Sequence, residues 1–225
     1  MKTVNAKTVN VIIAMAKTVN ANVTKRKKMN PSKASRETTP QKEWDEYFMS
    51  LAYEVAKKSK DPSSKNGCII VDERRRPVSF GYNGLVQGAD ESKLTLSERP
   101  MKYYFAIHSE MNALLFAERD LNGCTIYNNI ATCENCLKYC LQAGIKRFVY
   151  RQLRVSSYGK TNSMTTLDTD EAIIRLLSSM PEVQTLNLSN GKTYIQDILD
   201  SYDRESEEYK RLIKWVNNDP RIITA

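Results

Sequence analysis

The sequence lacks any long hydrophobic run. The longest apolar stretch near its start, residues 11–16, is far shorter than the roughly 18 apolar residues that a membrane-spanning helix needs. No cleavage-like segment follows that stretch, so we expect neither a membrane protein nor a secreted one. With 41% hydrophobic and 27% charged residues among 225, the chain can bury a core of its own, which excludes disorder throughout.

Cysteine and histidine are also scarce. The five cysteines are odd in number and occur without a secretion signal, which argues against a disulfide framework and predicts a protein of the reducing cytoplasm. They are Cys68, Cys124, Cys133, Cys136 and Cys140. The chain has a single histidine, so any site that needs imidazole chemistry has to use that residue.

Excess positive charge is absent from most of the chain. Residues 1–40 contain nine basic residues and one acidic residue, and so carry the whole net charge of +8, while 25 basic and 25 acidic residues balance in the remainder. This first segment also repeats Lys-Thr-Val-Asn at 2–5, 7–10 and 17–20. It is interpreted as a poorly ordered basic tail, either a solvated leader or an electrostatic tether for nucleic acid. The neutral body argues against a nucleic-acid groove.

Hydrophobic periodicity predicts an α/β domain after this tail. A helix is expected from Thr39-Pro40 to about Lys60, where Asp61-Pro62 ends it. Its apolar stripe consists of Trp44, Tyr47, Phe48, Leu51, Ala52, Val55 and Ala56. Strands are expected at 67–71 and 77–82 as a hairpin, followed by a loop over 83–100 and a helix over 107–119.

Strand and helix then alternate, which predicts parallel strands in the second half. Strands are expected at 124–130, 147–153 and 183–188, and helices at 134–143 and 168–180. Residues 194–217 indicate one or two polar helices with a buried side. That side consists of Ile195, Ile198, Leu199, Leu212, Ile213 and Trp215.

The residues that carry chemistry lie around the single histidine. His108 is followed two positions later by Glu110. Cys133 and Cys136 come after the predicted helix and strand that follow this pair. Cysteines three apart in the first turn of a helix face the same way, and the helix N-terminus stabilises their thiolates. Three protein ligands leave a tetrahedral zinc with one open position, which is the pattern of a catalytic site, and leave Glu110 free for proton transfer.

Each of these residues has a plain structural alternative. His108 alone could be an ordinary helix residue, and the two cysteines could be buried apolar side chains. Their combination and spacing favour the metal site over that alternative. Cys140 is a weaker candidate for a fourth ligand because it lies one turn deeper, and Cys68 and Cys124 are expected in the core.

Residues 41–153 resemble the deoxycytidylate (dCMP) deaminases of the zinc-dependent cytidine/deoxycytidylate deaminase superfamily. His-x-Glu followed by Cys-x-x-Cys is the signature of zinc nucleobase deaminases. Further similarity lies in the segments 59–67, Gly81-Tyr82-Asn83-Gly84, 108–114, 144–146 and 148–150. The resemblance implies a three-layer α/β/α fold with a mixed five-stranded sheet over 41–188, and a C-terminal helical extension over 189–225.

The resemblance also implies a reaction, in which dCMP is hydrolysed to dUMP and ammonia for thymidylate synthesis, with one zinc per subunit. Glu110 would move protons from water to ring N3 and to the leaving amine. The backbone N–H of Ser109 would hold the base carbonyl, and the Ala131 carbonyl would accept from the departing amine. Asn83 would contact the sugar, and Lys65 and Ser59 the 5′-phosphate. For Asn83 and Lys65, a plain turn residue and a solvated lysine remain alternatives.

The sequence departs from the family at two site positions. Thr132 stands where the family has proline, which predicts a less rigid turn and a threonine hydroxyl that could cap the following helix. Ser109 replaces the usual alanine. The resemblance further raises homo-oligomers, hexamers included, and dCTP and dTTP as effectors, although the loop over 85–100 does not decide whether an effector site exists.

Other functions stay open on the sequence alone. The basic tail leaves room for a deaminase of polynucleotide cytosine or adenine, although the interleaved aromatic and basic groove of single-strand binders is missing. A deaminase of another free or modified cytosine nucleotide shares the same zinc chemistry. A non-enzymatic zinc protein is disfavoured because a structural zinc needs no acid/base residue such as Glu110.

Overall fold

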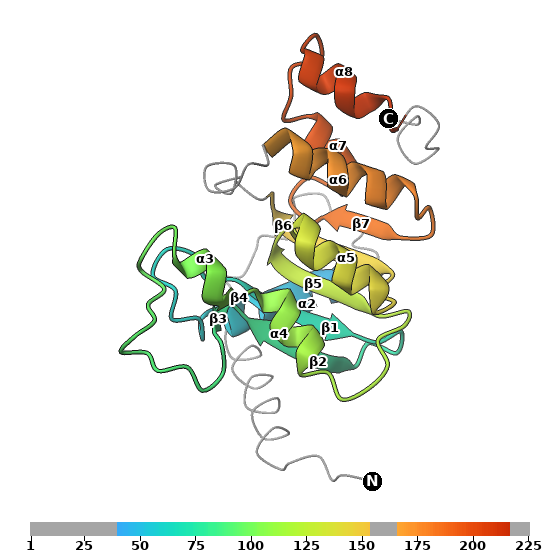
Figure 1. Ribbon diagram of the computed structural model, residues 1–225. Coiled ribbons are helices and arrows are strands. Elements are labelled where there is room, and N and C mark those ends of the chain that lie inside the picture. Colours follow the sequence, from blue (N-terminus) through green and yellow to red (C-terminus); the bar gives the residue numbers. More distant parts are fainter. Residues whose placement is uncertain (1–39, 154–165, 217–225) are drawn as a thin grey trace, which may run out of the picture.

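The computed structural model describes residues 40–153 and 166–216. A five-stranded sheet with the strand order β2-β1-β5-β6-β7 forms its centre (Figure 1). The strands are β1 (Gly67–Val71), β2 (Pro77–Tyr82), β5 (Thr125–Ile130), β6 (Arg147–Gln152) and β7 (Gln184–Asn187), and β3 (Gly84–Leu85) and β4 (Ala106–Ile107) form a separate two-stranded sheet. The predicted basic tail and its repeat lie outside the described residues.

Seven helices are described around these strands. They are α2 (Pro40–Ala56), α3 (Lys102–Phe105), α4 (Ser109–Leu115), α5 (Glu134–Gln142), α6 (Thr166–Ser178), α7 (Tyr194–Leu199) and α8 (Glu207–Ile213). Within the described ranges, no helix combines the length and the apolar character needed to cross a membrane.

The main sheet is mixed, as the resemblance implied. β1 pairs antiparallel with both β2 and β5, so β1 and β2 form the predicted hairpin. β5, β6 and β7 run parallel to one another, which confirms the prediction made from the alternation of strands and helices. Each parallel pair is joined by a crossover helix, as parallel strands require.

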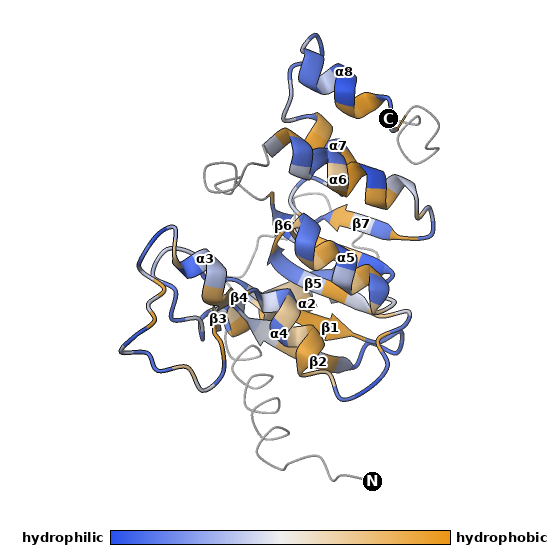
Figure 2. Cartoon of the chain, in the orientation of Figure 1, coloured by the Kyte–Doolittle hydropathy of each residue, from blue (hydrophilic) through white to orange (hydrophobic). Residues whose placement is uncertain are grey.

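Alternating side chains of the strands form two cores, one on each face of the sheet. On one face, Ile69 and Val71 of β1 pack with Phe48 of α2. On the other face, Cys68 and Ile70 belong to a larger core that includes residues of α5, α6 and α7. Because strand residues point alternately to opposite faces, β1 is apolar along its length, as Figure 2 shows, and the fold has three layers.

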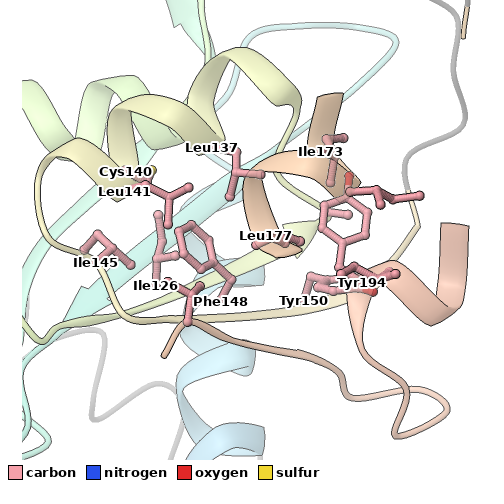
Figure 3. Packing of buried hydrophobic residues seen from close by; sticks show 14 of the residues in the cluster. Ile126, Leu137, Cys140, Leu141, Ile145, Phe148, Tyr150, Ile173, Leu177 and Tyr194 are labelled. Atoms are coloured by element: carbon pink, nitrogen blue, oxygen red, sulfur yellow. The ribbon is translucent and has the colours of Figure 1, made fainter. Parts of the chain in front are cut away.

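The C-terminal elements contribute to the same core as the zinc-motif helix α5. Figure 3 shows Ile173 and Leu177 of α6 and Tyr194 of α7 packed with Leu137 and Phe148 of the preceding elements. Leu212 of α8 is also completely buried. Most of the other residues of α8 are hydrophilic (Figure 2).

The first helix differs from the prediction in its end and in its buried face. It ends at Ala56 rather than near Lys60, and Trp44 and Tyr47 are each 36% exposed. Asp45 takes the buried position instead, because its carboxylate is paired with Arg147 at 2.7 Å and with the Tyr127 hydroxyl at 2.8 Å. The buried face of this helix therefore includes the carboxylate of Asp45, paired with Arg147, and excludes two of the aromatic residues that were expected there.

The helix predicted over 107–119 is shorter in the structure. It spans only Ser109–Leu115, while Ala106–Ile107 is strand β4 and the four-residue helix α3 lies in front of it. Of the predicted helical region 194–217, the structure describes residues up to 216, and these contain the two helices α7 and α8, which is one of the predicted alternatives. Trp215 was wrongly expected to be buried, since it is 38% exposed and its indole packs under Arg175.

Truncating a core residue of α6 should destabilise the whole domain. We expect Leu177→Ala to lower the free energy of unfolding by about 2–5 kcal/mol, because it leaves a cavity in the shared core. The same truncation at Leu115, which is 67% exposed, should change it by less than about 0.5 kcal/mol. Denaturant unfolding followed by circular dichroism measures both, and equal effects would contradict the shared core.

Candidate metal and catalytic site

Two helices begin at the site, and each places candidate metal ligands there. His108 is the residue before α4, and Cys133 is the residue before α5. The Nδ1 atom of His108 lies 3.5 Å from Sγ of Cys133 and 3.4 Å from Sγ of Cys136. All three donor atoms lie within 4.8 Å of one another. The structure therefore brings together the three residues that the sequence singled out as ligands.

The local fold of the cysteine pair follows from helix capping. Cys133 is the N-cap of α5, and its sulfur accepts a hydrogen bond from the backbone N–H of Cys136 at 3.5 Å. The threonine that precedes it is therefore not the cap, and the expectation that the Thr132 hydroxyl could cap this helix was wrong. Cys133 itself has an extended backbone conformation, with φ −71° and ψ 163°, and the helix begins at the next residue.

The donor types of the three residues suit a soft divalent cation, and Cys133 is the more acidic of the two thiols. A hydrogen bond from the Cys136 thiol, followed by the nearby His108, lowers the pKa of the Cys133 thiol well below its ordinary value. The same hydrogen bond and burial raise the pKa of Cys136. Zinc binds cysteine as the thiolate, and two cysteine sulfurs with one imidazole nitrogen form the donor set of a zinc site with three protein ligands, so these residues fit zinc.

Glu110 is the buried acid of the site. Its side chain is on the first turn of α4, and the residue is only 5% exposed. Burial, followed by the nearby Cys133, raises the pKa of its carboxyl. Its Oε2 accepts a hydrogen bond of 2.9 Å from the hydroxyl of Ser109, a residue that is completely buried. The serine therefore fixes one carboxylate oxygen, an effect that the usual alanine could not have.

The remaining cysteines lie in the core. Cys140 is completely buried and does not belong to the group of potential metal ligands, and burial raises the pKa of its thiol. Cys68 in β1 donates its S–H to the carbonyl oxygen of Ser109 at 3.2 Å. Cys124 is 2% exposed at the start of β5. Cys68 and Cys124 are therefore core residues, as predicted, and Cys140, the weaker candidate for a fourth ligand, lies in the core as well.

Three of the predicted nucleotide-binding residues, Ser59, Lys65 and Asn83, lie on or against one loop, residues 59–66. Asn83 is 6% exposed, and its side chain binds the backbone N–H of Asn66 and the carbonyl of Ser64, each at 2.8 Å. Ser59 is buried, and Lys65 is exposed on the same loop. Ala131 and Thr132 are both buried beside Cys133. The substrate contacts of these residues stay predictions.

A buried ion pair that sequence reasoning missed holds this loop. Lys102 of α3 binds Asp61 at 2.7 Å, with only 3% and 4% of the two side chains exposed. Its ammonium also donates to the Ser63 hydroxyl at 2.7 Å, and Arg99 donates to the same oxygen at 2.9 Å. Lys102 and Asp61 are 41 residues apart, so no local pattern could have identified the pair.

A separate cavity of about 1190 Å³ lies beside the site rather than in it. Edge strand β2, the loop after β3 and the end of α4 line it, with Phe80, Leu94 and Phe116 among the apolar residues. Its lining includes neither Glu110 nor any of the three metal ligands. Its position along the long loop separates it from the predicted chemistry.

Comparisons with known proteins point to one family. A family model for the zinc-binding region of cytidine and deoxycytidylate deaminases matches residues 42–152. The deoxycytidylate deaminase of Mycobacterium phage D29 is 35% identical over 121 residues, which are 48% of this chain and 94% of that protein. The deoxycytidylate deaminase of Homo sapiens is 36% identical over 114 residues, or 48% of this chain and 64% of that protein.

The match to the mammalian proteins is therefore partial, because the chain spans 64% of their length. Among solved structures, dCMP deaminase from the cyanophage S-TIM5 in complex with dCMP and dUMP aligns with a TM-score of 0.46 and 21% identity. That alignment covers 67% of this chain and 99% of the cyanophage protein.

Removing one ligand should abolish zinc binding, whereas removing the deeper cysteine should not. We expect Cys136→Ala to lose stoichiometric zinc because two remaining ligands hold the ion too weakly. Cys140→Ala should retain one zinc per chain, since its sulfur is outside the ligand group. Elemental analysis of the purified variants measures this, and loss of zinc from folded Cys140→Ala would refute the ligand assignment.

Breaking the buried ion pair should destabilise the fold. Lys102→Met leaves the Asp61 carboxylate buried without its cation, which should cost about 3–5 kcal/mol at pH 7. Lys60→Met makes the same change in the exposed pair with Glu91 and should cost less than about 1 kcal/mol. Denaturant unfolding measures both variants.

The difference between wild type and Lys102→Met should also depend on pH. Burial raises the pKa of Asp61, but hydrogen bonds from Lys102 and Ser63 outweigh burial and hold it below its usual value. The stabilisation is thus present above the unfolded pKa of about 3.9 and is lost as the pH falls through the lower folded pKa. A difference that grows on acidification would contradict this assignment.

Proposed function

The chain belongs to the cytidine and deoxycytidylate deaminase family, and we propose that it is a zinc-dependent hydrolase that converts dCMP into dUMP and ammonia. One observation carries the proposal. A buried carboxylate, Glu110, lies beside three residues whose donor atoms fit a single zinc ion. A purely structural zinc site would need no such acid/base group.

The chain's own residues divide the work of the reaction. Zinc, when bound by His108, Cys133 and Cys136, supplies the Lewis acid that makes water a nucleophile near neutral pH. Glu110 accepts the proton that water loses on attacking C4 of the cytosine ring, and delivers it to ring N3. Glu110 then moves the second proton of that water to the 4-amino group, which leaves as ammonia. C4 becomes the carbonyl carbon of dUMP.

Burial and hydrogen bonding prepare Glu110 for this role. Burial raises the pKa of its carboxyl, which makes the carboxylate a stronger base toward water. The hydroxyl of Ser109 binds Oε2, so Oε1 is the oxygen that we assign to proton transfer. The completely buried position of Ser109 keeps bulk water away from this pair.

Backbone groups and one loop would bind the nucleotide. We assign the N–H of Ser109 to the base carbonyl and the carbonyl of Ala131 to the departing amine. Asn83 is assigned to the sugar, and Lys65 and Ser59 to the 5′-phosphate. These last two residues lie on the loop that Asp61 and its partners hold in place, which would present them in a fixed geometry.

Compartment, assembly and regulation extend the proposal. We assign the reaction to the cytoplasm, because all five cysteines are free thiols. Self-association into homo-oligomers, hexamers included, is supported by two exposed aromatic side chains, Phe116 after α4 and Tyr139 on α5. Binding of dCTP and dTTP as effectors is proposed on the family resemblance.

Ammonia release from a substrate panel tests the proposed reaction. The panel contains dCMP, CMP, deoxycytidine, dCTP, dAMP, 5-methyl-dCMP and short single-stranded DNA. We expect turnover of dCMP by the wild type, and a loss of about 10²–10⁴-fold in kcat for Glu110→Gln, because the proton shuttle is removed. Glu118→Gln makes the same change at an exposed position and should keep wild-type activity.

Zinc content is measured alongside each activity. Glu110→Gln should retain one zinc per chain, since Glu110 is not a ligand. Turnover of DNA but not of dCMP would replace the proposed substrate with a polynucleotide. Zinc bound without turnover of any member of the panel, with dCTP present as activator, would refute the enzymatic proposal.

A further inference from the structure

Residues 131–133, which lead into Cys133, are called the metal-binding loop below. One hydroxyl group of helix α7 forms a hydrogen bond with this loop. Tyr194, the first residue of α7, is 3% exposed and donates a hydrogen bond of 3.0 Å to the carbonyl oxygen of Thr132. Thr132 immediately precedes the ligand Cys133. The two bonded residues are 62 positions apart, and Tyr194 lies beyond the matched family region, which ends at residue 152.

This hydrogen bond acts on the peptide that leads into Cys133. The carbonyl of Thr132 and the N–H of Cys133 belong to one planar unit, so fixing the oxygen fixes the plane from which the Cys133 side chain departs. Threonine leaves its own φ free, whereas proline would restrict it. On the other side, the N–H of Ala131 donates to the carbonyl of Gln152 at 2.8 Å. The loop is therefore held by β6 and by α7.

Tyr194 is itself held firmly in place. Its backbone N–H donates to the Thr185 hydroxyl at 2.9 Å, and its ring lies 5.1 Å from the ring of Tyr150. Figure 3 shows the two tyrosines at the same end of the core. The start of α7 is further fixed by a reciprocal capping box between Thr193 and Gln196. The hydroxyl therefore occupies a position that the sheet determines.

A buried carboxylate joins α7 to the neighbouring strands β6 and β7. Asp197 accepts hydrogen bonds from the Tyr150 hydroxyl at 2.6 Å and from the side-chain amides of Asn187 and Asn190 at 2.6 and 2.7 Å. Asp197 is 7% exposed. Satisfied buried networks of this kind rigidify the elements that they connect. Helix α7 is thus coupled to β6 and β7 one turn away from Tyr194.

We propose that Tyr194 is a positioning residue of the metal site. Its hydroxyl holds the Thr132–Cys133 peptide so that Sγ of Cys133 faces His108 and Cys136, which makes α7 part of the metal-binding unit. The inference rests on the proposed function only in taking these three residues as zinc ligands, and it is independent of the substrate.

The substitution Tyr194→Phe tests the proposal, because it removes the hydroxyl and keeps the ring. We expect zinc to pass from the variant to a chromophoric chelator about tenfold faster than from the wild type. The cobalt-substituted variant should also show altered thiolate-to-cobalt and d–d absorption bands. Tyr202→Phe is the matched control, since its hydroxyl binds Asp170 at 2.8 Å in the C-terminal region, and it should behave as the wild type.

A stability measurement separates metal positioning from a general structural role. The increase in unfolding midpoint that zinc produces over the chelator-stripped protein should be smaller in Tyr194→Phe than in the wild type or in Tyr202→Phe. An equal loss of stability with and without zinc, or a wild-type release rate and cobalt spectrum, would overturn the proposal. Faster zinc release from Tyr194→Phe would uphold it even if dCMP were not a substrate.

Discussion

The site depends on a geometric constraint, namely that two helices begin beside the same end of strand β5. His108 stands immediately before α4, and Cys133 stands before α5, which follows β5 after a short loop. β5 is paired on both sides, antiparallel to β1 and parallel to β6, so its end is fixed within the sheet. A one-residue shift of β5 would turn each of its side chains to the opposite face and move Cys133 away from His108.

Buried carboxylates complement this constraint by joining segments that are distant in sequence. Asp45 binds Arg147 at a separation of 102 residues, Asp61 binds Lys102 at 41, and Asp197 binds Tyr150 at 47. Burial alone would raise the pKa of Asp45 and of Asp61, but their hydrogen-bonding partners hold both values below the usual range. Asp45 and Asp61 therefore stay charged beside their partners, and the bonds of all three carboxylates select one arrangement of the chain.

The C-terminal elements α6, β7 and α7 are part of the sheet and core of the domain. β7 is the fifth strand of the main sheet, and α6 and α7 supply Ile173, Leu177 and Ile198 to the core that also contains Leu137 of the metal-ligand helix. The matched family region ends at residue 152. Two hydrogen bonds cross that boundary: Tyr194 donates to the metal-binding loop, and Tyr150 donates to Asp197 of α7. Both parts of the chain therefore contribute to the site.

The sequence by itself identified the three candidate ligands, the candidate acid and most of the regular elements. Zinc is bound by only a few residue types, and a chain with a single histidine offers few combinations of them. The alternation of strands with helices predicted the parallel half of the sheet. Tertiary structure alone decided the buried place of Asp45, the ion pair of Lys102, the short element α3 and the contact of Tyr194 with the metal-binding loop. The side-chain contacts join residues 41 to 102 positions apart, which local periodicity cannot reveal. Helix α3 has four residues, which is too short for a periodic pattern.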